Sequence, residues 1–136
     1  MNNFIIKNAE YVEVAIPTGS TKQTIYFPDL PNLRNRPITG IESFSATEQS
    51  VTNSGATVQA LANLHDASVT LYFDGGEFIV CPLLAFRRVG GTTSFYQQIP
   101  QLAGQNIIWT KSYVSMNANV ANFAGKSFLF NVYYNR

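Results

Sequence analysis

Histidine, cysteine and carboxylate side chains are the residues of this chain that could carry catalysis or bind a metal. The only histidine, His65, stands beside Asp66. Adjacent residues of a helix or a strand point in different directions, so the two do not form an acid–base dyad by sequence alone. The only cysteine, Cys81, lies well separated from His65, and one histidine with one cysteine does not make a metal-ligand set. We interpret His65 as a surface or cap residue and Cys81 as a small buried apolar side chain.

The eight carboxylates contain no Asp-rich loop of the calcium-binding kind. A glycosidase would need two of them brought together in a cleft, and the sequence leaves such a pairing open. Asp74 and Glu77 are the most closely spaced pair around a turn, but they flank the glycines of a hairpin, where acidic residues are ordinary. The sequence therefore predicts no enzyme, no cofactor and no metal site.

Charge is low and balanced in this chain. Charged residues make up 12% of the sequence, and nine basic against eight acidic residues leave a net charge of +1. Nucleic-acid binding depends on dense positive charge, so we expect no specific nucleic-acid partner. No apolar run approaches the ~18 residues of a membrane span. The first residues do not resemble a signal peptide, and we expect synthesis in a cytoplasm and a soluble product.

Apolar and polar residues alternate in several short runs. In 68–73, for example, Val69, Leu71 and Phe73 share one face, which is typical of a strand with one side on a core. The runs expected to form strands are 11–16, 23–27, 38–46, 68–73, 77–84, 85–89, 93–99, 106–114 and 127–134. The residues predicted to form the core are Val12, Val14, Val69, Leu71, Phe73, Phe128, Phe130 and Val132. Gly40 predicts a bulge or a close backbone approach.

The connection 49–66 is the one segment that favours a helix. We expect Val58, Leu61, Ala62 and His65 on one side of it, with Gln59 and Asn63 pointing outward. Eight or so short antiparallel strands without alternating helices leave a sandwich or a barrel. We predict one all-β domain over residues 1–136, an antiparallel β-sandwich of the single jelly-roll type with about eight strands and at most one short helix. An immunoglobulin-like sandwich is the second choice, although the chain has no Cys…Trp…Cys pattern.

Two segments carry more apolar side chains than is usual for a strand or loop with one solvent-exposed side. In 77–84 both faces are apolar, so the second face packs either under a loop of the same chain or against another protein. The proline-rich segment 27–39 is either a loop over the open end of the sandwich or an arm that docks on a neighbouring subunit. We predict that the outer face of 77–84 and the arm are buried by a neighbouring subunit, with arginines at the rim. The candidate interface residues are Leu30, Leu33, Arg34, Arg36, Ile79, Cys81, Leu83, Arg87 and Arg88.

These features together resemble a known class of protein. The β-runs 11–16, 68–73, 77–84 and 127–134, with the proline-rich stretch "YFPDLPNLRNRPITGIESF", are similar to the small single jelly-roll capsid proteins that build or plug the vertices of tailless icosahedral bacteriophages. The resemblance implies a non-enzymatic capsid subunit, a vertex (penton) or minor capsid protein, located in the virion. It also implies other capsid proteins as partners and a homo-oligomer, for which a pentamer is one possibility.

A second function of a different class remains open. A carbohydrate-binding β-sandwich would line a sugar site with tyrosine, asparagine and Trp109 side chains. Aromatic side chains exposed on one sheet face would favour this alternative, with a sugar receptor as the partner.

Overall fold

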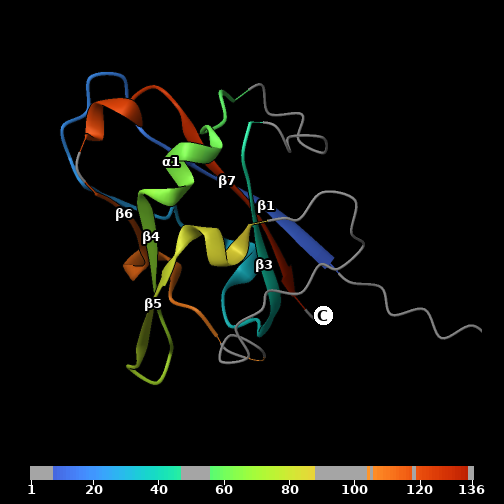
Figure 1. Cartoon of the computed structure of the whole chain (residues 1–136). Coiled ribbons are helices and arrows are strands. Elements are labelled where there is room, and N and C mark those ends of the chain that lie inside the picture. The colour runs from blue at the N-terminus through green and yellow to red at the C-terminus, as the bar shows by residue number, and fades with distance from the viewer. Residues whose placement is uncertain (1–7, 47–55, 88–103, 105, 118, 135–136) are drawn as a thin grey trace, which may run out of the picture.

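Two antiparallel β-sheets pack face to face in the computed structural model, which describes residues 8–46, 56–87, 104, 106–117 and 119–134 (Figure 1). One sheet contains, in spatial order, β1 (Asn8–Ala15), β7 (Ser127–Tyr134) and β3 (Ile38–Phe44). The other contains β2 (Thr24–Tyr26), β6 (Tyr113–Met116), β4 (Ala67–Tyr72) and β5 (Phe78–Pro82). The predicted all-β sandwich is confirmed.

The strands pair in a nested order. β1 pairs with β7, β2 with β6, and β4 with β5, so the first described strand meets the last and the innermost two form a hairpin. This nesting is the wiring of a jelly roll, in which a long antiparallel pair of chain segments is wrapped around the core. The immunoglobulin-like alternative does not have this order. The strand predicted at 93–99 lies outside the described residues.

Two of the predicted strands are replaced by 3₁₀ turns. The run 106–114 forms an isolated bridge from Ile107 to Phe73, continues as η4 (Trp109–Lys111) and becomes a strand only at Tyr113. The run that follows β5 forms η2 (Leu83–Phe86), so the predicted strand 85–89 is not formed over its described residues, apart from a bridge at Arg87. Pro82 is the last residue of β5, an end-of-strand position on an edge strand where a residue without an N–H is tolerated. Two further 3₁₀ turns are η1 (Pro31–Leu33) and η5 (Val120–Asn122).

Two glycines have the backbone roles that strands and hairpins require. The register between β3 and β7 shifts between Ile38 and Gly40, which confirms the predicted irregularity at Gly40. In the β4–β5 hairpin the loop ends at Gly76, whose φ of 89° lies in the left-handed region. A glycine at this position allows the three-residue hairpin loop that aligns Tyr72 with Phe78.

One short helix, α1 (Leu61–His65), lies in the connection where it was predicted. Its buried residue is Leu64. The inward prediction was right for Val58, which is buried, and for Leu61, which packs partly buried against the core, and it was wrong for Ala62 and His65, which are exposed. The prediction that Gln59 points outward was also wrong. Gln59 is fully buried, and its side-chain amide donates to the Phe123 carbonyl oxygen at 3.0 Å. Burying an amide costs little free energy when it is hydrogen-bonded. This hydrogen bond holds the connection against the turn before β7.

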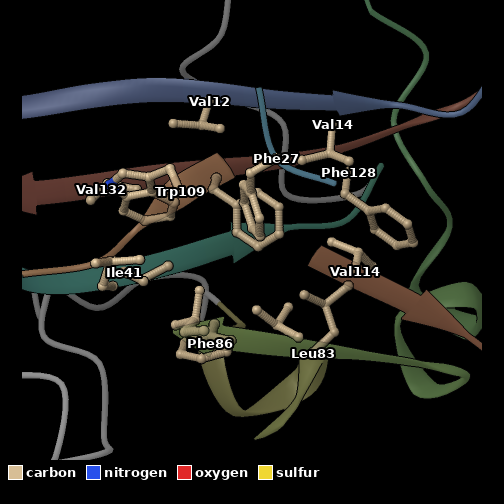
Figure 2. Close-up of a cluster of buried hydrophobic side chains, with 14 of the residues drawn as sticks. Val12, Val14, Phe27, Ile41, Leu83, Phe86, Trp109, Val114, Phe128 and Val132 are labelled. Atoms are coloured by element: carbon tan, nitrogen blue, oxygen red, sulfur yellow. The ribbon is translucent and has the colours of Figure 1, made fainter. Parts of the chain in front are cut away.

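The core lies between the two sheets. All eight predicted core residues are buried there. Figure 2 shows Val12, Val14, Phe128 and Val132 of one sheet facing Val114, Leu83 and Phe86 across the layer. A smaller cluster of Phe44, Val58 and Leu129 lies on the outer side of the three-stranded sheet, under the 56–59 connection.

Leucine 83 and valine 80 provide a test of which side of this region is core. Leu83 is completely buried and Val80 is 59% exposed. We expect Leu83→Ala to lower the free energy of unfolding by about 2–5 kcal/mol, because it leaves a cavity in the core. The control Val80→Thr keeps the branched side chain and should change it by less than about 0.5 kcal/mol. Urea unfolding followed by circular dichroism measures both, and equal effects would contradict the observed packing.

Candidate interaction surface

Most of the predicted interface residues belong to the core of the chain itself. Leu33 and Leu83 are fully buried and Leu30 and Cys81 are 9% exposed, all in the main apolar cluster, while Ile79 packs partly buried against it. The prediction that these side chains form the outer face of 77–84 and a docking arm is therefore corrected. The leucines of the proline-rich segment close their own sandwich, so of the two alternatives for this segment the loop is the one observed.

The predicted rim arginines do not gather in one place. Arg34 is exposed and forms an ion pair with Asp29 inside the same segment. The Arg36 guanidinium lies over the Tyr134 ring, 5.4 Å from its centroid, as a cation–π contact. Arg87 follows η2 and is exposed, and its backbone forms an isolated parallel β-bridge with Ser43 of β3. Arg88 lies outside the described residues.

The apolar face that the four-stranded sheet does expose is the opposite one. Directly paired residues of antiparallel strands point to the same side. Register therefore aligns Tyr26, Tyr113, Thr70 and Val80 in one row across the sheet, with Tyr72 beside Phe78 in the next. Thr24, Ser115, Ser68 and Pro82 form a third row. We call these ten residues the aromatic face.

The aromatic face contains four rings and no charged side chain. Tyr26 and Tyr113 meet edge to face with centroids 5.4 Å apart, and Tyr72 and Phe78 lie tilted at 5.1 Å. Tyr26, Phe78 and Val80 are 58%, 55% and 59% exposed, and they are the exposed large apolar side chains of the described residues. The rings are thus preorganised in pairs, and their accessible parts lie near the two edges of the sheet.

The outer side of the three-stranded sheet is chemically different. Glu42 is buried and accepts hydrogen bonds from Tyr133 Oη at 2.7 Å and from Asn131 Nδ2 at 3.2 Å. Glu13 accepts a hydrogen bond from Ser127 Oγ at 2.8 Å. These bonds join neighbouring strands, so each carboxylate acts as an acceptor within the sheet.

One open pocket lies beside η1 and η4, with a volume of about 320 Å³. Its lining residues are Asp29, Leu30, Arg34, Asn35, Ile107, Ile108, Trp109 and Thr110. Trp109 is 4% exposed, and its buried Nε1 has no hydrogen-bond partner. The ring therefore cannot serve as the flat, accessible platform that was expected for a sugar site.

Comparison with models of known protein families, with curated proteins and with solved structures found no match. In the described part of the chain, no three His, Cys, Asp or Glu side chains group as metal ligands would. No helix there has the length and apolar character needed to cross a bilayer.

The Cys81 thiol should react slowly with alkylating agents in the native protein. Burial raises the pKa of its thiol, since the thiolate is the form that loses hydration. At pH 8 we expect alkylation by iodoacetamide to be at least ~10-fold slower in the folded protein than in urea. Because the unfolded thiol ionises more readily, the free energy of unfolding should also fall as pH rises through ~8.5, and this loss should vanish in Cys81→Ala. Equal alkylation rates in the two states would refute the inward position of Cys81.

Proposed function

We propose that this protein is a non-enzymatic structural subunit of a virus particle, a vertex or minor capsid protein that acts through contacts with neighbouring subunits. The observation that carries the proposal is the aromatic face, an outward sheet surface without charge on which Tyr26 and Phe78 are exposed and Tyr72 and Tyr113 are half-buried. The nested jelly-roll wiring agrees with the family that the sequence resembles. The proposal places the protein in the virion after synthesis in a host cytoplasm.

The composition of the aromatic face supports a protein partner. The centres of protein–protein interfaces are depleted in charged residues and enriched in tyrosine and phenylalanine. The exposed parts of Tyr26, Phe78 and Val80 amount to on the order of 300 Å². These side chains lie on the two edge strands of the sheet, β2 and β5, where exposed apolar groups favour association with another chain. Identical subunits around a closed ring would use one such contact repeatedly, and five copies fit an icosahedral vertex.

A lysine placed on the aromatic face tests the proposal. Tyr26→Lys and Tyr113→Lys introduce a charge where an interface would exclude water, so we expect at least ~10-fold weaker self-association, equivalent to about 1.4 kcal/mol. Ala15→Lys is the matched control, because Ala15 is exposed on β1 of the opposite sheet. Sedimentation velocity over a concentration series measures association, and circular dichroism confirms folding. A wild-type chain that stays monomeric throughout, or variants that associate like the control, would contradict the proposal.

Carbohydrate binding is the second candidate, and the same rings favour it. Aromatic faces stack on the apolar sides of sugars, and Tyr26 and Phe78 are accessible for this. The site would differ from the expected one, because Trp109 is buried. Binding on a glycan array that is lost in Tyr26→Ala, together with a strictly monomeric wild-type chain, would select this function over the structural one.

A further inference from the structure

β5 forms one edge of the four-stranded sheet, and β2 forms the other. The one strand neighbour of β5 among the described residues is β4, and the β4–β5 hairpin extends at the bottom of Figure 1 away from β1, β7 and β3. An exposed apolar edge strand can pair with another chain, and monomeric proteins usually block it with charges, bulges or proline. Between Phe78 and Val80 this strand carries none of these.

The hydrogen-bonding phase of the hairpin identifies the backbone groups on this edge. The Phe73 N–H donates to the Glu77 carbonyl oxygen at 2.8 Å. Hydrogen-bonded and non-hydrogen-bonded pairs alternate in an antiparallel ladder. Ile79 and Cys81 therefore bond to β4, whereas the N–H and C=O groups of Phe78 and Val80 point away from it. Pro82 presents only a carbonyl.

We propose that β5 pairs antiparallel with β5 of a second copy of this chain, with a two-fold axis passing between the two Ile79 residues. Phe78 of each copy then lies opposite Val80 of the other. The inference rests on the proposed function, because it supplies one of the subunit contacts that an assembly needs. It joins the two four-stranded sheets and their aromatic faces into one continuous surface.

The register of the proposed β5–β5 pair follows from the position of Pro82. Centring the pair on Ile79 matches each Phe78 with a Val80, the two residues that offer both a donor and an acceptor, and leaves Pro82 beyond the last hydrogen-bonded pair. Centring it on Val80 makes as many bonds but sets Pro82 opposite Phe78, whose carbonyl then faces a residue without an N–H. The first register also makes two aromatic–β-branched side-chain pairs, which stabilise antiparallel sheets.

The positions of the charged residues are compatible with a second copy as the occupant, and the exposed area limits how tightly it binds. The acidic residue at the start of the strand, Glu77, lies at opposite ends of the pairing in the two copies, so the like charges do not meet. At 55% and 59% exposure, Phe78 and Val80 bring on the order of 200 Å² per copy to the contact. The two copies together contribute about 400 Å², well below the ~1,200 Å² total of a stable two-body interface, so the contact is weak alone and fits a subunit held by several contacts at once.

Disulfide trapping tests the pairing and its register. In a Cys81→Ala background, one chain carries Phe78→Cys and another carries Val80→Cys. Hydrogen-bonded partners have Cα atoms about 5.5 Å apart, inside the range of a disulfide. Under a mild oxidant we expect the mixture to form a covalent dimer at least ~10-fold faster than either variant alone. A mixture of Val80→Cys with Ala15→Cys measures random collision.

Trapping no faster than in this control would overturn the proposal, and so would faster cross-linking of Val80→Cys by itself, which would indicate the other register. Val80→Pro provides a readout without new cysteines, because it removes an edge donor and no bond to β4. It should fold and lose dimerisation, and unchanged dimerisation would also overturn the proposal. Trapping with no effect of Tyr26→Lys on assembly would instead count against the proposed function alone.

Discussion

The fold depends on aromatic packing across the sandwich. The Phe27 ring lies 5.3 Å from Trp109 and 5.3 Å from Phe130, measured between centroids, and so connects the end of β2 and the turn before β6 with β7 of the opposite sheet. Figure 2 shows Phe27 and Trp109 side by side within the cluster. Large rings bury much of the apolar area that holds two small sheets together.

Because one face of each sheet packs in this core, only the opposite face of each sheet is available for contacts with other molecules. In the four-stranded sheet every inward position is apolar, and the outward side consists of hydroxyl, aromatic and aliphatic groups without charge. The three-stranded sheet covers part of its outer side with the 56–59 connection and places hydrogen-bonded Glu42 and Glu13 there. The two outer surfaces therefore differ, and we propose association through the uncharged one.

The strands and their core residues could be predicted from the sequence because alternation is a local signal. Which side chains of β5 point inward and which point outward could have been predicted as well. With Val69 and Leu71 inward, the short Asp74–Gly76 turn sets Ile79 and Cys81 opposite them, which leaves Phe78 and Val80 outside. The burial of Leu30 and Leu33 could not be predicted, since the proline-rich segment has no periodicity and its position over the sandwich depends on distant packing. Gln59 was missed for a related reason, because its partner at Phe123 is remote in sequence.

Residue-resolved hydrogen exchange most directly tests whether subunits associate through β5, the edge strand of the four-stranded sheet. Amide exchange at low and at high protein concentration would be compared along β5. The account predicts that the Phe78 and Val80 amides gain protection with concentration, while Ile79 and Cys81, already bonded to β4, are protected throughout. Unchanged, fast exchange of Phe78 and Val80 under conditions where the protein has assembled would contradict it.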